Sequence, residues 1–336
     1  MQNVKLGQLI ELYDYKRKPL SKMQRIKSSG VIPYYGAAGI IDYVNDYLFQ
    51  GEYILLAEDG TVKTNSNNPV LNLTQSNERF WVSNHAHIFK SKNIEQKYLY
   101  YLLSTIDISR YITGAVQPKI NQENLLNIDL KIHSDKNVRN HIVNTIGSID
   151  DLIENYNKIN DVINYVSQLF VDKSLINNYK SVKVIDIATV NSGKSTKKLQ
   201  SGKYEIIGAN GCLGYTNYYN LSSRAIITGR VGTIGTFKRI NEPVWCSDNT
   251  LIVRTIYFNY LFYYLKQNFD SSSLNRGSTQ PLITQTDLLD YEIKIPNNID
   301  DLEKILDKYY FLIKENNNKI KMLTNLKQQY LKKFFG

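Results

Sequence analysis

The chain has 336 residues, a length typical of about two domains. Hydrophobic residues make up 42% of it, which excludes an intrinsically disordered chain. Its net charge of +10 is compatible with a polyanionic partner such as DNA. No apolar run approaches the roughly 18 residues of a membrane span, and no signal peptide opens the chain. We therefore expect a globular cytoplasmic protein that does not associate with membranes.

The first globular segment is predicted to span residues 1–136. Residues 14–27 are polar and basic and indicate a loop. Short apolar runs predict strands, grouped Tyr and Leu residues predict a helix, and an alternating run predicts a closing strand. In chain order these elements are residues 53–57, 80–82, 87–89, 97–105 and 128–132. The mixture predicts an α/β (α+β) domain.

Residues 137–176 are predicted to form the first of two long helices. Proline is absent from this stretch, and apolar residues recur at steps of three and four. Such steps indicate a seam that packs against another helix, here with one polar member. The predicted seam is Leu152, Asn155, Ile159, Val162, Val166 and Leu169.

The second globular segment, residues 177–297, repeats this order, and residues 298–336 predict a second long helix. Its seam has the same spacing: Ile313, Asn316, Ile320, Leu323, Lys327 and Tyr330. In an antiparallel pair, Asn155 and Asn316 would meet near the middle and fix the register by a hydrogen bond. Helices of this length reach roughly 57 Å, so we expect them to set the spacing of the two globular segments.

Three pairs of motifs indicate that the chain is two copies of one unit. Residues 114–126 (GAVQPKINQENLL) and 277–289 (GSTQPLITQTDLL) share Gly, Gln, Pro, Ile, Gln, Leu and Leu in the same order. Residues 81–84 (WVSN) correspond to 245–248 (WCSD), and 36–39 (GAAG) to 208–211 (GANG). Repetition in a constant order predicts duplicated domains. Cys212 and Cys246 occur only in the second copy, so we expect both to be unpaired.

Basic residues in the loops of both copies are the candidate DNA contacts, because phosphates and guanine edges are bound by Lys and Arg. The candidates are Lys16, Arg17, Lys18, Lys194, Lys197, Lys198, Arg230 and Arg276. A solvated surface charge is the alternative for each. The turn after the buried strand is acidic in the first copy, at Glu58 and Asp59, but glycine-rich with Arg230 in the second. This difference indicates that the copies read different ligands.

No set of residues indicates catalysis. Residues 192–196 (SGKST) resemble the end of a phosphate-binding loop, but Ala188 stands where that loop needs glycine. His85 and His87 share one face of a predicted strand, yet two ligands without a third favour a structural role over a metal site. We predict no catalytic residue, no metal and no cofactor held by this chain.

The duplicated motif, the strand-turn segments 55–60 and 226–235 and the two long helices resemble the specificity subunit of type I restriction-modification systems. The resemblance covers essentially the whole chain. It implies two target recognition domains joined by two long antiparallel helices in a coiled coil, with pseudo-two-fold symmetry. It also implies that each domain reads one half of a bipartite, asymmetric DNA site.

The resemblance implies a non-catalytic subunit in a DNA-methylating phage-defence complex. Its partners would be double-stranded DNA, two methyltransferase (modification) subunits that bind S-adenosylmethionine, and additional restriction-translocase subunits. Two other functions stay open. One is the specificity subunit of a related bipartite enzyme whose partner chain both cleaves and methylates. The other is a standalone DNA-binding or antirestriction protein, which would lack methyltransferase partners.

Overall fold

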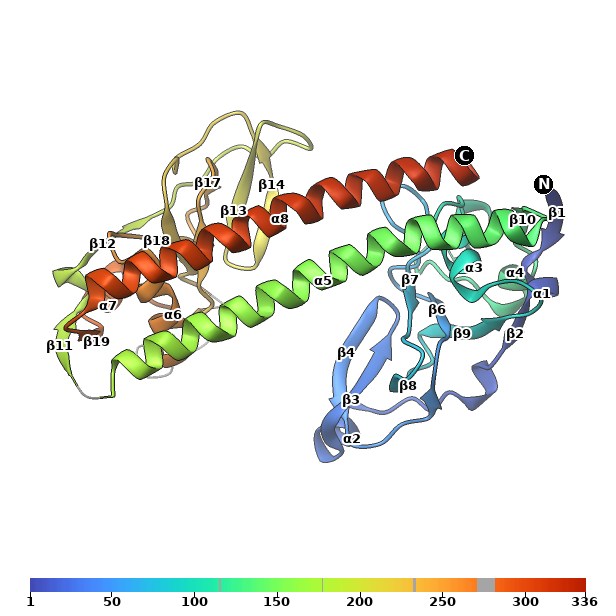
Figure 1. The fold of residues 1–336 in the computed structure, drawn as a ribbon, viewed down its shortest axis with the longest axis horizontal. Helices are drawn as coiled ribbons and strands as arrows, with labels where there is room; N and C mark the ends of the chain where they lie inside the picture. Colours follow the sequence, from blue (N-terminus) through green and yellow to red (C-terminus); the bar gives the residue numbers. More distant parts are fainter. Residues whose placement is uncertain (115, 177, 232–233, 271–281) are drawn as a thin grey trace. The chain divides into compact units, whose positions relative to one another are not determined.

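The computed structural model describes residues 1–114, 116–176, 178–231, 234–270 and 282–336. Its contacts divide the chain into unit 1, Met1–Glu154 with Ile320–Gly336, and unit 2, Asn155–Lys319. The two long helices are α5 (Lys136–Ser174) and α8 (Ile299–Phe335), and each contributes one part to each unit (Figure 1). Among the described residues, no helix is long and apolar enough to cross a membrane.

Unit 1 contains two four-stranded sheets and a two-stranded sheet that pairs the first strand with the closing strand. The first sheet has the order β2 (Ile10–Leu12), β9 (Ala86–Ser91), β6 (Ile54–Ala57), β7 (Leu71–Leu73). The second has the order β4 (Gly39–Val44), β3 (Ser29–Gly36), β8 (Arg79–Val82), β5 (Phe49–Gln50). The remaining elements are β1 (Gln2–Lys5), β10 (Asp129–Ile132), α1 (Leu6–Leu9), α2 (Lys22–Lys27), α3 (Gln96–Leu103) and α4 (Gln122–Leu126).

Unit 2 repeats this topology, except that three described strands form its second sheet, where unit 1 has four. Its first sheet has the order β12 (Ala188–Ser192), β18 (Thr250–Thr255), β15 (Ala225–Gly229), β16 (Lys238–Ile240). Its second has the order β14 (Gly211–Thr216), β13 (Tyr204–Gly208), β17 (Trp245–Cys246). The other elements are β11 (Tyr179–Lys183), β19 (Glu292–Pro296), α6 (Phe258–Asn268) and α7 (Gln285–Leu289). The prediction of two like units of mixed α/β structure is confirmed. Cys212 and Cys246 are both free thiols, as predicted.

The central strands and hairpin turns follow directly from the sequence. All four residues of β6 are buried, as expected for an uninterrupted apolar run covered on both faces. The β3–β4 hairpin turns at Gly39 with φ of 127°, and the β13–β14 hairpin turns at Gly211 with φ of 133°. Residues other than glycine rarely adopt such positive φ values, so glycine at both positions allows the two turns to have the same conformation.

The long helices pack antiparallel within each unit. In unit 1, Lys327 on α8 forms an ion pair of 2.6 Å with Asp150 on α5. In unit 2, the side-chain amide of Asn316 on α8 donates to Asn160 Oδ1 on α5 at 2.9 Å. A second contact in each unit gives the direction: the ring centroids of His141 and Phe334 lie 6.0 Å apart in unit 1, and those of Phe170 and Tyr309 lie 6.0 Å apart in unit 2. Within each unit, contacts therefore move forward along α5 as they move backward along α8. The predicted antiparallel direction is confirmed.

The seam predicted on α8 is buried, but the seam predicted on α5 is not. Ile313 and Asn316 are each only 8% exposed, and Ile320 and Leu323 are half-buried. On α5, by contrast, Leu152, Asn155, Ile159 and Val162 are exposed, and only the last two members of the predicted seam, Val166 and Leu169, are half-buried. Asn316 therefore pairs with Asn160 and not with Asn155.

The error on α5 has a physical reason. A second stripe with steps of three and four runs along the helix about one residue away, or roughly 100° around it. This buried stripe is Ile142, Ile146, Ile149, Asn160, Ser167 and Val171. It contains Asn and Ser, so hydrophobicity alone selects the wrong face. Most of the more apolar predicted face of α5 is therefore exposed to solvent when the chain has no partner bound.

Candidate nucleic-acid interface

The repeated motif joins two loops in each unit. Its isoleucines, Ile120 and Ile283, are fully buried. Their backbone N–H groups donate to the carbonyl oxygens of Glu58 at 2.8 Å and Arg230 at 2.9 Å, the residues that follow β6 and β15. In unit 1 the loop before Ile120 turns at Gly114 with φ of 86°. The motif thus holds the turn after the central strand in place.

The second glutamine of the motif holds another loop. In unit 1, Gln122 donates from Nε2 to Asp14 Oδ2 at 3.0 Å, just after β2. In unit 2, Gln285 donates from Nε2 to Ser192 Oγ at 2.7 Å, at the end of β12. The part of the second motif at residues 277–281 lies outside the described residues. In both units the motif is therefore structural and gathers loops from different strands.

The two tryptophans of the chain hold the basic loops by equivalent hydrogen bonds. Trp81 donates from Nε1 to the carbonyl oxygen of Lys18 at 2.6 Å. Trp245 donates from Nε1 to the carbonyl oxygen of Lys194 at 2.6 Å. Because each bond ends on a backbone oxygen, the lysine side chains stay exposed. The loops are therefore presented in the same way in both units.

The predicted DNA contacts that the structure describes differ in how far their side chains are exposed. Arg230 is half-buried, and its Nε is buried without a partner among the described residues. Arg276 lies outside the described residues. The exposed candidates, whose ammonium groups are available to phosphates, are Lys16, Lys18, Lys194, Lys197 and Lys198.

The prediction for Arg17 is corrected. Its side chain is only 12% exposed and forms ion pairs with Glu58 at 2.7 Å and Asp14 at 3.2 Å. It also donates to the carbonyl oxygen of Ala86 at 2.7 Å. A guanidinium has five N–H donors in a fixed plane, and most of these are used here. Arg17 therefore organises the loops from within and is not a surface contact.

Arg17 belongs to a buried charged network in unit 1. The buried ring of His87 lies with Nδ1 2.6 Å from Asp14 Oδ2 and Nε2 2.8 Å from the carbonyl oxygen of Ile120. Burial alone would raise the pKa of Asp14, but the hydrogen bond and charge of His87 hold it below the usual range. Both ring nitrogens of His87 therefore face oxygen acceptors, the Asp14 carboxylate and a backbone carbonyl.

Glu58 completes the network. Burial would raise its pKa, but hydrogen bonds from Arg17 and Lys119 lower it. Asp14, Glu58 and His87 place ligand atoms within 4.8 Å of one another, a spacing compatible with a metal ion. However, Arg17 and Lys119 already neutralise the carboxylates, and both nitrogens of His87 are bonded to other groups. The residues fit a self-contained ion network better than a metal site.

A second pair lies at the surface beside this network. His85, whose side chain is 51% exposed, places Nδ1 2.8 Å from Asp59 Oδ1 and 3.0 Å from Oδ2. Asp59 also forms a backbone bridge with Lys119, whose side chain is 48% exposed. The sequence favoured a structural role for His85 over a metal site but gave no partner for its side chain. The pairing with Asp59 joins two turns 26 positions apart, and no local spacing signals it.

Unit 2 has the same backbone frame without the charged network. The strand registers of the first sheets of the two units place Ile10 and Ala188 at equivalent positions. Asp14 of unit 1 therefore corresponds to Ser192 of unit 2. By the same matching, His87 corresponds to Leu251 and Glu58 to Arg230. The two units therefore differ in charge and polarity where their loops converge.

A sequence profile described as the type I restriction modification DNA specificity domain matches residues 1–165 and 176–325. The chain belongs to this family. A putative type I restriction enzyme specificity subunit of Haemophilus influenzae is 30% identical over 128 residues, which is 38% of this chain and 32% of that protein. The chain thus matches about a third of that relative's length.

A solved structure has a fold similar to that of this chain. The S subunit of a type I restriction-modification system from M. genitalium aligns with 100% of this chain and 96% of its own. The TM-score is 0.60 at 15% sequence identity. At this identity the likeness establishes the arrangement of the elements and nothing more.

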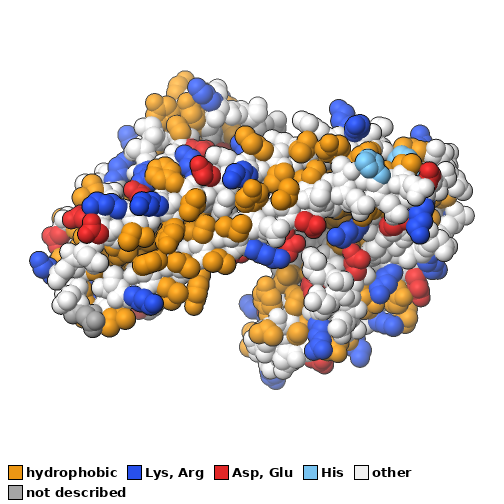
Figure 2. All heavy atoms as spheres, viewed as in Figure 1, with side chains coloured by type: hydrophobic (Ala, Val, Ile, Leu, Met, Phe, Trp, Pro, Cys, Tyr) orange, Lys and Arg blue, Asp and Glu red, His pale blue; other side chains and the backbone are white. Residues whose placement is uncertain are grey.

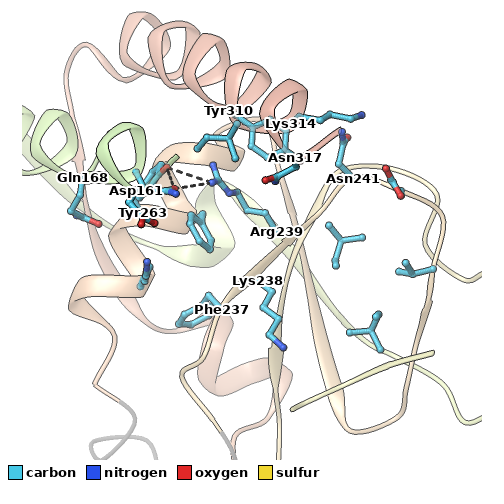
Figure 3. A pocket seen from close by; sticks show the side chains of 18 of the residues that line it. Asp161, Gln168, Phe237, Lys238, Arg239, Asn241, Tyr263, Tyr310, Lys314 and Asn317 are labelled. Carbon is cyan, nitrogen blue, oxygen red and sulfur yellow. Dashed lines mark hydrogen bonds between the residues drawn. The ribbon is translucent and has the colours of Figure 1, made fainter. Parts of the chain in front are cut away.

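Unit 2 also contains an open groove of about 1090 Å³, lined by β16 and by helices α5, α6 and α8. Arg239 extends from β16 into it (Figure 3). Its guanidinium lies 4.4–5.0 Å from the ring centroids of Phe262, Tyr263 and Tyr310, and donates to Asn259 Oδ1 at 2.9 Å. Arg239 therefore anchors the sheet edge to the helices, and its charge is already used.

Proposed function

We propose that this chain is the DNA-reading subunit of a type I restriction-modification complex and has no catalytic role of its own. Each unit would read one half of a bipartite, asymmetric site. The proposal rests mainly on one observation: the two units share the hydrogen bonds that hold their loops but differ in the side chains that the loops carry. The motif and tryptophan bonds are repeated, whereas Glu58 and Asp59 of unit 1 are replaced by Arg230 and Val231 in unit 2.

The proposal is tested by exchanging residues 1–136 for the corresponding segment of another specificity subunit. The exchanged chain would be produced with its modification subunits, and methylated sites would be mapped by sequencing. We expect one half-site to change and the other to stay as in the parent. A simultaneous change of both half-sites would contradict the idea of two separate readers.

The basic loops predict a salt-dependent affinity. If Lys16 and Lys194 contact phosphates, each alanine substitution should reduce the slope of log affinity against log salt by about 0.9. The preferred sequence should not change, because phosphate contacts carry no base information. Lys308→Ala, an exposed position on α8, is the control. An unaltered slope in Lys194→Ala would remove that lysine from the interface.

Partner docking is supported by apolar side chains that remain exposed on the long helices. We call them the outer stripe: Ile159, Val162 and Tyr165 on α5 in unit 2, and Met322 and Leu326 on α8 in unit 1. They are 47%, 61%, 66%, 71% and 40% exposed. Figure 2 shows hydrophobic side chains gathered over α5. Helical stripes of this kind are typical of protein interfaces.

We propose modification subunits as the occupants of the outer stripe, one on each helix. A stripe on both helices is what two copies of one partner would need. S-adenosylmethionine would then be bound by those partners and not by this chain. Restriction-translocase subunits would join the same complex. A standalone DNA-binding protein would have no use for these exposed apolar faces.

A further inference from the structure

Two exposed residues occupy the same place in the two units but differ in type. His85 follows the Ser83-Asn84 pair before β9, and Asn249 follows Ser247-Asp248 before β18. The carbonyl oxygen of His85 accepts the backbone N–H of Glu58 at 2.9 Å. The carbonyl oxygen of Asn249 accepts the backbone N–H of Arg230 at 3.0 Å. Equivalent backbone bonds therefore present an imidazole in unit 1 and an amide in unit 2.

The imidazole of His85 is oriented by its neighbour. Both carboxylate oxygens of Asp59 lie within 3.0 Å of Nδ1, so that nitrogen carries a hydrogen. Nε2 has no hydrogen-bond partner in the part of the chain that the structure describes. An exposed ion pair of this kind contributes little to stability, with typical values of about 0–1 kcal/mol. The pair is better explained by what it offers to a ligand than by folding.

We propose that His85 and Asn249 are specificity-determining residues, each reading one base pair of its own half-site. This inference rests on the proposed function. An asparagine side chain matches the N6 and N7 atoms of adenine with two hydrogen bonds. The imidazole of His85, whose Nδ1 is bonded to Asp59, has only Nε2 available for a hydrogen bond with a base. It accepts from an exocyclic amino group when neutral and donates to guanine O6 or N7 when protonated.

The difference between the copies favours bases over phosphates as the ligand. Phosphates are the same in both half-sites, and the lysines held by Trp81 and Trp245 are indeed retained in both units. His85 and Asn249 are not retained, although the backbone bonds around them are. Base-edge readout is the part of DNA recognition that must differ between unlike half-sites.

The test uses the full chain in complex with its modification subunits and measures methylation on a library of randomised half-sites. We expect His85→Asn to change the preference at one base pair of one half-site by roughly 5- to 150-fold, the range of one good base contact. Asn249→His should change one base pair of the other half-site. His141→Asn, an exposed histidine on α5, is the matched control and should leave both half-sites unchanged.

Asp59→Asn provides a second variant that keeps the His85 ring but weakens its orientation. It should reduce discrimination at the base pair affected by His85→Asn and at no other. If His85→Asn and Asp59→Asn both methylate the parental site with parental preferences, the inference is wrong. A parental complex that methylates no bipartite site would instead refute the proposed function, so the two failures are distinguishable.

Discussion

His87→Leu should destabilise unit 1 by about 3–5 kcal/mol, the usual cost of removing one partner from a buried ion pair. Leucine is the residue found at the equivalent position of unit 2, Leu251, so size and shape are not the problem. The loss arises because the carboxylate of Asp14, which is only 7% exposed, loses its hydrogen bond to the buried His87 ring. Urea unfolding in a Trp245→Phe background measures it, since Trp81 then reports unit 1 alone.

The double variant Asp14→Ser/His87→Leu is the control for this prediction. It reproduces the Ser192 and Leu251 pair of unit 2, where a glutamine from the motif still holds the loop. We expect it to recover more than half of the stability lost by His87→Leu. If the double variant is no more stable than the single one, Asp14 and His87 are not energetically coupled.

The same network predicts acid sensitivity. The folded-state pKa of Asp14 and that of Glu58 are both lowered, so their stabilisation is present above the unfolded carboxyl pKa of about 4. It is lost as pH falls through the lowered folded-state values. The stability of unit 1 should therefore decrease below about pH 4, and less steeply in the double variant that lacks the Asp14 carboxyl.

The second large effect concerns partner docking. Ile159→Glu/Val162→Glu should reduce copurification with the modification subunit at least a hundredfold. Burial of one such side chain contributes about 1.5–3 kcal/mol, and an unpaired charge in an interface adds a further cost. Folding and DNA binding by the chain alone should persist, because both positions are exposed.

Asn157→Glu is the matched control for the outer stripe. It adds one negative charge to an exposed position of the same helix, outside the stripe. It should copurify as the parent does. Equal loss in the control and the double variant would indicate a general charge effect. Full copurification of the double variant would show that the outer stripe is not the docking surface.

Periodicity and repetition were sufficient for the long helices and the duplication, but the loop predicted at residues 14–27 contains helix α2, and the partners of most side chains were not predictable. The helix predicted at residues 137–176 is observed at Lys136–Ser174, since a long apolar period without proline has no competing structure. The orientation of α5 was not predictable because two stripes share its spacing. The role of Arg17 depends on Glu58, 41 positions away, and that of His87 on Asp14, 73 positions away. Such pairs depend on tertiary contacts that no local pattern encodes.

The bonds from Trp81 and Trp245 have a consequence for how recognition evolves. Both indoles donate to a backbone carbonyl, a group that every amino acid possesses. Replacing Lys18 or Lys194 by any other residue would leave that acceptor in place. The motif isoleucines likewise bond to the backbone of Glu58 and Arg230 and not to their side chains. If these loops contact DNA as proposed, mutation can alter what they recognise while they keep their conformation, so a new target sequence does not require a new fold.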